Sequence, residues 1–267
     1  MLVSRPMRVE RIWSGNRLRN YHYLIACEET GEALAIDPLQ WEDVLQAARA
    51  RGWTITQILN THEHHDHTGG NAGLVAATGA KLLAHHAAKI DGVDRGLSQG
   101  DAIRVGRSVE LQCLDTPGHT MTHICLFAHA DSPALFSGDT LFNAGAGNCK
   151  GGGHPDALFT TFATQLARLP DATKLYAGHD YLLNNLGFTL DREPGNTAAE
   201  QLLARVKDTD AADMPVMTLG EEKGFNTFFR LDSPTVIAGL RAKFPDLPDE
   251  PTARDVFVRL RELRNSW

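Results

Sequence analysis

The stretch Asn60–Asn71, NTHEHHDHTGGN, places four histidines and two acidic residues at positions 62 to 67. Imidazole and carboxylate groups at this density are costly to bury unless they are paired or bind a metal. The run before them, TITQILN at residues 54–60, has the β-branched composition of a strand. The cluster therefore follows a predicted strand directly, and a metal is the ligand that it first suggests.

Four side chains of this stretch have the spacing of metal ligands. Alternate residues of an extended chain point to the same side, so His62 and His64 can hold one ion. Asp66 and His67 come where the chain turns into the next helix, and they could face a second ion. His65 lies between residues that face the metals, so we expect it to point away. Neutral imidazole and carboxylate suit zinc, iron or manganese.

Three residues further along the chain share one kind of setting. His119 in DTPGHT, Asp139 in SGDTLF and His179 in YAGHDY each follow a predicted strand and have a glycine as a neighbour. Catalytic groups on loops that a rigid sheet holds in place have this setting. These three residues complete the set of ligand candidates.

Strand-like and helical patterns alternate up to about residue 180. Strand-like runs occupy residues 8–13, 20–27, 32–37, 54–60, 80–85, 102–106, 108–115, 123–128, 134–138 and 173–178. Helices are expected over residues 41–52, 68–79 and 156–169, with Asp156 placed to cap the last one. This pattern predicts a strand-rich domain over residues 1–180.

From about residue 181 the strand patterns stop. Thr197 and Glu200 have the spacing of a capping box in front of a helical apolar pattern. Residues 252–267 form a second helical pattern, with Leu260 and Leu263 on its apolar stripe. We therefore expect a small helical domain over residues 181–267.

The composition argues against several classes of protein without excluding them. The 267 residues carry a net charge of −7, which argues against a dedicated nucleic-acid binder, and no run is long enough to form a transmembrane helix. The first 16 residues lack the apolar core of a signal peptide. The four cysteines are far apart, as expected for free thiols in the cytoplasm. We expect neither a nucleic-acid nor a membrane partner.

The motifs together resemble one known family. THEHHDH fits the T-H-x-H-x-D-H signature of the metallo-β-lactamase superfamily, and TPGHT, SGDTLF and GHDY are similar to its later motifs, in the expected order. GHDYLLNNLGFTLDREPGN and NTFFR look specifically like glyoxalase II, the hydroxyacylglutathione hydrolase. The resemblance covers nearly the whole chain. It implies an α+β fold, the αββα metallo-β-lactamase sandwich, followed by a C-terminal α-helical substrate-binding domain.

The resemblance also implies a ligand set for two divalent metal ions. One metal would take His62, His64 and His119, and the other Asp66, His67 and His179, with Asp139 and a water or hydroxide as bridges. Asp66 and Asp139 are the carboxylates to which we assign catalytic roles. Zinc is the metal we expect, with iron or manganese as alternatives.

The residues that would bind glutathione depart from the family pattern. The basic residue and two aromatics that usually follow DTLF are replaced here by Asn148-Cys149-Lys150 and a glycine run. In the last helix, the most direct register places Leu260 and Leu263 where the family has a basic pair, and Arg261 and Arg264 lie one position along.

We predict that Lys150, Tyr181, Arg261 and Arg264 bind the substrate. The alternatives are that the two arginines are solvated side chains and that Tyr181 is a packed core residue. For Asp37 and His123 the reading stays open between support of the site and hydrogen bonding within the fold.

The function that these features imply is hydrolysis of a thioester. The expected substrate is S-D-lactoylglutathione or a related acyl-glutathione, cleaved to the acid and the free thiol. The alternatives are a lactonase or other thioesterase of the same fold and, from a different class, a persulfide dioxygenase that uses a single iron. Metal counting separates the hydrolase from the dioxygenase.

Overall fold

Runs of β-branched and aromatic residues form two sheets in the first part of the chain. The computed structural model describes residues 7–267, so residues 1–6 of the segment considered for a signal peptide lie outside the described part. The chain divides into two compact units. The first extends to Thr116 and resumes over Thr122–Gly138, and the second comprises Pro117–Met121 and Asp139–Trp267.

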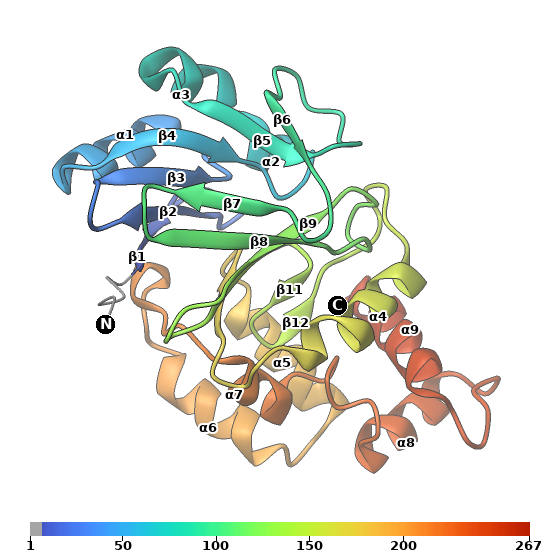
Figure 1. The fold of residues 1–267 in the computed structure, drawn as a ribbon. Helices are drawn as coiled ribbons and strands as arrows, with labels where there is room; N and C mark the ends of the chain where they lie inside the picture. Colours follow the sequence, from blue (N-terminus) through green and yellow to red (C-terminus); the bar gives the residue numbers. More distant parts are fainter. Residues whose placement is uncertain (1–6) are drawn as a thin grey trace. The chain divides into compact units, whose positions relative to one another are not determined.

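The first sheet of the first unit has six strands in sequential order. They are β1 (Met7–Trp13), β2 (Tyr21–Cys27), β3 (Glu32–Ile36), β4 (Thr54–Leu59), β5 (Lys81–His85) and β6 (Arg95–Leu97). The pairs β1–β2 and β2–β3 are antiparallel, and the pairs from β3 to β6 are parallel. Parallel neighbours need crossover connections, and two of these are the helices α1 (Trp41–Ala50) and α3 (Asn71–Thr78), which pack on one face of the sheet (Figure 1).

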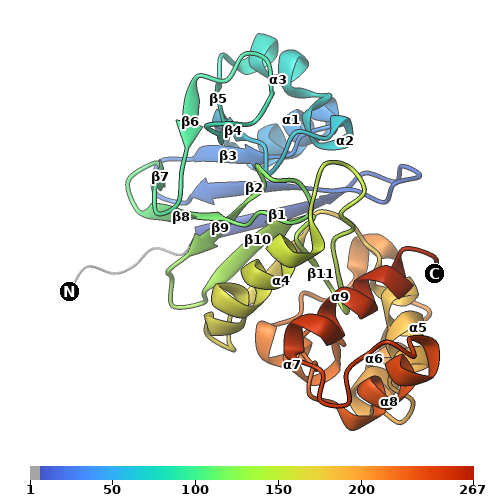
Figure 2. The ribbon, with the colours of Figure 1, turned by 90° about the vertical axis from the view of Figure 1, so that its right-hand side faces the viewer.

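The second sheet lies against the first within the same unit (Figure 2). Its strands there are β7 (Ala102–Val105), β8 (Val109–Asp115), β9 (Ile124–Ala128) and β10 (Ala134–Gly138), all antiparallel to their neighbours. Every residue of β2 is buried because the helices cover one face and this sheet covers the other. The Tyr23 and Phe136 rings meet between the sheets, 5.6 Å apart.

The second unit is mostly helical. Its elements are β11 (Leu141–Phe142), β12 (Gly145–Ala146), α4 (Pro155–Thr164), the 3-10 turns Leu166–Arg168 and Ala211–Asp213, β13 (Lys174–Ala177), α5 (Leu182–Arg192), α6 (Thr197–Val206), α7 (Leu219–Phe225), α8 (Pro234–Lys243) and α9 (Ala253–Arg264). Its core contains Leu186 from α5, Leu202 from α6 and Phe225 from α7. In Figure 2, α4 and α9 lie side by side, and Phe159 and Phe257 meet edge to face between them.

Two predicted helix caps are wrong. Helix α4 begins after His154, whose ring Nδ1 accepts from the Asp156 amide, so Asp156 lies inside the first turn, where its charge still favours the helix dipole. Helix α6 begins after Asn196, whose side chain accepts from the Ala199 amide at 3.0 Å, so Thr197 is already helical. An asparagine one residue earlier satisfies the same orphan amides that a threonine cap would satisfy.

None of the helices formed by residues 7–267 combines the length and the apolar composition needed to cross a bilayer. The turn from Arg192 to Asn196, which looks like a joint in the sequence, connects α5 to α6 inside the second unit. Buried Glu193 holds this turn, because its carboxylate accepts from Arg230 and Ser233.

Candidate metal centre

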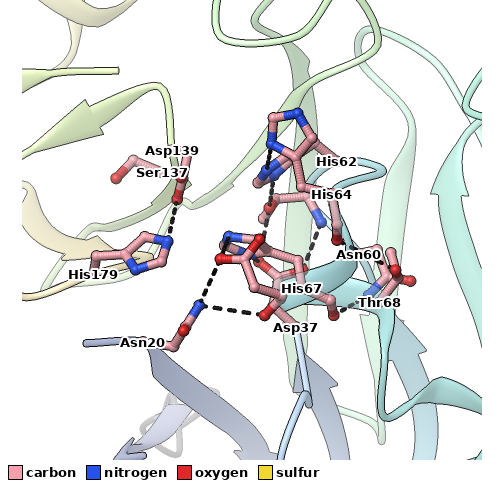
Figure 3. A network of polar contacts seen from close by, with 12 residues as sticks. Asn20, Asp37, Asn60, His62, His64, His67, Thr68, Ser137, Asp139 and His179 are labelled. Atoms are coloured by element: carbon pink, nitrogen blue, oxygen red, sulfur yellow. Dashed lines mark hydrogen bonds and ion pairs between the residues drawn. The ribbon is translucent and has the colours of Figure 1, made fainter. Parts of the chain in front are cut away.

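The histidine cluster of the first unit lies directly after β4. His62 is buried, and its Nε2 is 3.0 Å from Nδ1 of His64. Asp66 and His67 lie in the short helix α2 (His65–Thr68), and Figure 3 shows the His62, His64 and His67 rings gathered at this point. His65 is exposed, as its place between two ligand candidates predicted.

Asp37 supports this cluster from the end of β3. Its carboxylate accepts from the Thr61 amide at 2.8 Å, from the Thr61 hydroxyl at 2.7 Å and from His67 Nδ1 at 2.9 Å. A carboxylate only accepts, so His67 carries its proton on Nδ1 and presents a lone pair on Nε2. The backbone of Asp37 has φ of 49°, which a non-glycine residue adopts at a cost.

The protonation of His62 follows from the same carboxylate. The Thr61 hydroxyl gives its proton to Asp37, so it accepts from His62 Nδ1 at 3.0 Å. His62 therefore presents a lone pair on Nε2, on the side where His64 lies. One buried aspartate thus sets the tautomers of two ligand candidates, which is how side chains behind a metal site usually act.

Asp66 is oriented by a chain of two asparagines. The Asn16 side-chain amide donates to Asn20 Oδ1 at 2.8 Å, which fixes the orientation of the Asn20 amide. Asn20 Nδ2 then donates to Asp66 Oδ2 at 3.1 Å and to the Asp66 carbonyl at 3.2 Å. Figure 3 shows Asn20 reaching up from the strand end toward this group. Sequence reasoning missed Asn20, since one polar residue before a strand is an ordinary turn signal.

The glycines of TGGN permit the tight turn after α2. A Cβ on Gly70 would lie 1.8 Å from the Pro38 carbonyl oxygen, so no other residue fits there. Beyond the turn, Asn71 Nδ2 donates to Asn60 Oδ1 at 2.6 Å, and Asn60 Nδ2 donates to the His67 carbonyl at 2.9 Å. The two ends of the cluster are therefore bonded to each other.

The second unit holds the other three ligand candidates, all of them buried. His119 Nδ1 donates to the Asn148 carbonyl at 2.7 Å, which leaves its Nε2 lone pair 3.6 Å from Asp139 Oδ2. His179 Nε2 lies 3.3 Å from the other oxygen of Asp139 (Figure 3). Asp139 thus turns one oxygen to each histidine, the arrangement that a bridging carboxylate requires.

The donor set of each unit fits divalent metal ions. The Nε2 lone pairs of His62, His67 and His119 face nitrogen or carboxylate acceptors, and acceptors at such distances repel unless a cation or proton lies between them. Several imidazoles and two carboxylates are the donors that zinc, iron and manganese take. The assignment of individual ligands to two ions stays a prediction.

His123, left open by the sequence, is a hydrogen-bonded residue of the first unit. Its Nδ1 lies 2.9 Å from the Thr116 hydroxyl, and its ring stacks on His62 with centroids 5.1 Å apart. It supports the His62 ring from one side.

The four predicted substrate-binding residues line one pocket of the second unit, of about 250 Å³. The lining is Phe142, Ala146, Asn148, Lys150, Tyr181, Asn185, Arg261, Arg264, Asn265 and Trp267. Tyr181 stacks on the His179 ring, with centroids 4.9 Å apart and planes 5° apart, so it connects the pocket wall to a ligand candidate. Lys150 Nζ donates to the Asn265 carbonyl at 3.0 Å.

The two arginines of α9 differ in their partners. Arg261 is only 3 % exposed, and its Nη1 donates to the carbonyls of Ala146 and Gly147 at 2.6 and 3.0 Å. Its Nε has no acceptor within the described residues. Arg264 is half-buried and donates to Asn185 Oδ1 at 3.0 Å.

The charge of these two arginines is not balanced within the unit. Burial lowers the pKa of Arg261 to about 10, and burial also lowers the pKa of Arg264. No carboxylate among residues 7–267 forms an ion pair with either guanidinium, although ion pairs are numerous elsewhere. A pocket with two uncompensated guanidinium groups is suited to an anionic ligand.

Comparison with known proteins agrees with this description. The metallo-beta-lactamase superfamily profile matches residues 20–179, and the profile of the hydroxyacylglutathione hydrolase C-terminus matches residues 180–267. A hydroxyacylglutathione hydrolase from Polaromonas sp. is 68% identical and one from Nitrosococcus oceani 60% identical, each over 98% of this chain and 100% of the relative.

Among solved structures, ETHE1 from Myxococcus xanthus is similar with a TM-score of 0.66 and 26% identity, over 97% of this chain and 99% of that one. TTHA1623, solved in a di-iron-bound form, is similar with a TM-score of 0.59 and 25% identity, over 82% of this chain and 99% of that one.

The fold and the donor residues define a metal-dependent hydrolase. The chain belongs to the metallo-β-lactamase superfamily and, within it, to the hydroxyacylglutathione hydrolases, a family of thioester hydrolases. The predicted α+β fold class, an αββα sandwich with a C-terminal helical domain, is confirmed. The profiles meet at residues 179 and 180, while the compact units divide elsewhere, so the predicted domains 1–180 and 181–267 stay a prediction.

Proposed function

We propose that this protein hydrolyses S-D-lactoylglutathione, or a closely related acyl-glutathione, to the acid and free glutathione. The observation that carries the proposal is the pair of arginines without carboxylate partners in the pocket beside Tyr181. Glutathione has two carboxylates, and a guanidinium can bind each one through two hydrogen bonds. Relatives at 68% and 60% identity that carry the name hydroxyacylglutathione hydrolase support this substrate class.

The proposed metal ligands are the seven residues of the sequence motif. His62, His64 and His119 would hold one ion, Asp66, His67 and His179 the other, and Asp139 both. The metal identity we propose is zinc, with iron or manganese as alternatives that the same donors accept. When bound, such ions lower the pKa of water and polarise a carbonyl group.

Substrate binding and the protonation of the histidines depend on side chains of the protein. Arg261, Arg264 and Lys150 would hold the glutathione carboxylates, and Tyr181 would close the pocket beside His179. Asp37 keeps the protons of His62 and His67 on Nδ1, so that their Nε2 atoms stay available as ligands. The leaving thiolate is a weak base and needs little acid assistance.

Water is the nucleophile we propose, because Cys149, the thiol between the pocket residues Asn148 and Lys150, is poorly suited to that role. Burial raises the pKa of Cys149 to about 11, so this thiol stays protonated near neutral pH. A Cys149→Ala variant should therefore keep both its activity and its metal content. A trapped acyl-enzyme on Cys149 would contradict the mechanism.

The test of the function combines two measurements on the purified protein. Elemental analysis should find two metal ions per chain, and thiol release should be fast with S-D-lactoylglutathione and slow with acyl thioesters of smaller thiols. One tightly bound iron, together with oxygen consumption on glutathione persulfide, would instead identify the persulfide dioxygenase. Fast cleavage of lactones would favour the other alternative.

A cytoplasmic location is part of the proposal. It is supported by the four cysteines, which form no disulfide within residues 7–267.

A further inference from the structure

The hairpin formed by β11 and β12 is too small to be stable by itself. It has only the pairs Leu141–Ala146 and Phe142–Gly145, and a lone two-stranded ribbon is marginal in water even when it is longer. At its tip, Ala144 has φ of 55°, a left-handed conformation that costs free energy in a residue other than glycine. Other elements must therefore hold this hairpin in place.

Glu222 of α7 bonds to the tip of the hairpin. The carboxylate is fully buried, and it accepts from Asn143 Nδ2, from the Ala144 amide and from Asn226 Nδ2, each at 2.9 Å. Asn226 Nδ2 also donates to the Gly145 carbonyl at 3.2 Å. No cation pairs with this carboxylate within the described residues, and burial raises its pKa to about 7. A buried acid that accepts from two donors on the strained turn and from one at the end of its own helix is too costly to be incidental.

The hairpin adjoins the ligand candidates on both sides and forms part of the pocket wall. Asp139 comes two residues before it, and after it the carbonyl of Asn148 accepts from His119 Nδ1 at 2.7 Å. Phe142 and Ala146 are walls of the pocket. A Cβ on Gly147 would lie 2.0 Å from the Asp139 carbonyl, so the end of the hairpin is packed directly on the ligand loop.

We propose that Glu222 is a positioning residue: it holds the β11–β12 hairpin from α7, and through the hairpin it sets the pocket wall and the orientation of His119. Arg261 holds the far end of the same hairpin through the Ala146 and Gly147 carbonyls. Helix α7 thus acts on substrate binding through the hairpin alone, whereas α9 acts both through the hairpin and through the pocket-lining Arg261 and Arg264. The proposal rests on the proposed function for the choice of substrate and for His119 as a metal ligand.

Two substitutions at Glu222 distinguish the effect of losing its hydrogen bonds from the effect of losing its charge. In Glu222→Gln, the amide oxygen can still accept from Ala144 and Asn226, and its NH2 group can donate to Asn143 once that side-chain amide turns over. Within residues 7–267, Asn143 has no other side-chain hydrogen bond that would oppose this rotation of its amide. In Glu222→Leu, the volume is nearly kept and all three hydrogen bonds to the carboxylate are lost, which leaves the Ala144 amide buried without a partner.

The experiment measures KM, kcat, metal content and Tm for both variants. Glu222→Gln should stay within about two-fold of wild type, and Glu222→Leu should raise KM about ten-fold and lower the retained metal, since losing support behind a ligand typically costs ten-fold or more. Val206→Ala is the control, because it removes side-chain volume from the helical core that also contains Ala144 but removes no hydrogen bond of the hairpin. It should lower Tm and leave KM unchanged.

Wild-type KM and metal content in Glu222→Leu would overturn the proposal, as would an equal rise of KM in Val206→Ala at the same Tm. If Glu222→Leu does not fold, Asn143→Ala removes one of the three bonds and should raise KM about three-fold. Hydrogen exchange at the Ala144 amide, faster in Glu222→Leu than in Glu222→Gln, tests the contact without any substrate. If wild type does not cleave S-D-lactoylglutathione, the proposed function fails, while this exchange measurement still decides the role of Glu222.

Discussion

The two units present their ligand candidates in different ways. In the first unit, His62, His64, Asp66 and His67 lie within six consecutive residues after one strand. Asp37, at the end of the neighbouring strand, supports His62 and His67, and Asn20 orients Asp66. In the second unit, His119, Asp139 and His179 come from places up to 60 residues apart in the chain.

In the second unit, the support of His119 is itself held by two helices that come much later in the chain. A backbone carbonyl at Asn148 holds His119, and the hairpin that precedes this carbonyl is itself held by Glu222 and Arg261. The first set is thus supported directly by Asp37 and Asn20, whereas the support of the second set depends on helices that hold the hairpin. Damage in the first unit should therefore affect one or two ligands at a time, and damage in the helices should act on ligands and substrate together.

The largest effect is expected from the carboxylate that faces two histidines. Asp139→Ala should lose at least one metal ion and lower kcat/KM on the order of 10³-fold, because charge stabilisation at the reacting carbonyl would depend on the ions that Asp139 is proposed to hold. Elemental analysis and thiol-release kinetics check this. Asp171→Ala is the control, because this carboxylate is exposed and bonds only to Lys223 near the surface.

Next in size should be the effect of Asp37→Asn. The new amide would donate to His67 Nδ1, which moves the histidine proton to Nε2 and removes the lone pair needed for a ligand. We expect metal affinity in the first unit to fall about 100-fold, the upper end for a group behind a ligand. Metal titration with a competing chelator measures it. An unchanged affinity would show that the tautomers are not set by Asp37.

Substitutions of the two arginines of α9 should then distinguish an effect on substrate binding from an effect on metal binding. Arg264→Ala should raise KM for glutathione thioesters about ten-fold and leave kcat and metal content intact, because a charge-assisted bond to a carboxylate is worth about 1.5–3 kcal/mol. Arg261→Ala should raise KM and also lower metal content, since Arg261 holds the Ala146 and Gly147 carbonyls. Arg259→Ala should change neither, because Arg259 lies on the same helix but pairs with Asp246 and Glu262 and does not line the pocket. If both pocket variants keep wild-type KM, the substrate carries a different thiol.

A smaller effect is expected from the asparagine chain that orients Asp66. Asn20→Ala should weaken metal binding about ten-fold. Asn16→Ala should weaken it about two-fold, because Asn16 acts only through the orientation of the Asn20 amide. Equal effects of the two variants would mean that the surrounding loop, and not this relay, positions Asp66.

The smallest effect on activity, and a measurable one on stability, is expected from the charge of Glu222. Burial raises its folded pKa from 4.5 to about 7, so its stabilising contribution is fully present below pH 4.5 and is lost as pH rises through 7. Wild type should lose up to about 3 kcal/mol relative to Glu222→Gln between pH 4.5 and 8, at 1.36 kcal/mol per pKa unit. Denaturant unfolding of both proteins across this pH range gives the difference in their free energies of unfolding. Effects of pH on metal binding are common to both proteins and cancel in this difference.

Several elements could be predicted from the sequence because their signals are local. The strands that precede the ligand candidates are rich in apolar and β-branched residues, and β4 ends within one residue of the prediction. The helix that contains Arg261 was predicted as well, together with its buried Leu260. The caps of α4 and α6 were wrong because several polar residues near each helix start can accept from the same amides.

The hairpin β11–β12 and helix α7 were not predicted from the sequence. A strand of two residues carries no period, and a helix of seven residues with Gly220 and Gly224 has weak intrinsic propensity. Glu222 looks like a solvated acid beside Glu221, and only the packing of α7 against the hairpin shows that one of the two is buried.

The sequence by itself determined the family, the seven ligand candidates and the strand that precedes the first four. It could do so because spacing along an extended chain already sets which side chains point together. Only the tertiary structure decided which histidine nitrogen is protonated, which asparagines and acids support the ligands, and that Arg261 is buried against two carbonyls while Arg264 bonds to Asn185. These features depend on hydrogen bonds between residues far apart in the chain. Such bonds leave no periodic signal in the sequence, since either partner alone looks like an ordinary polar residue.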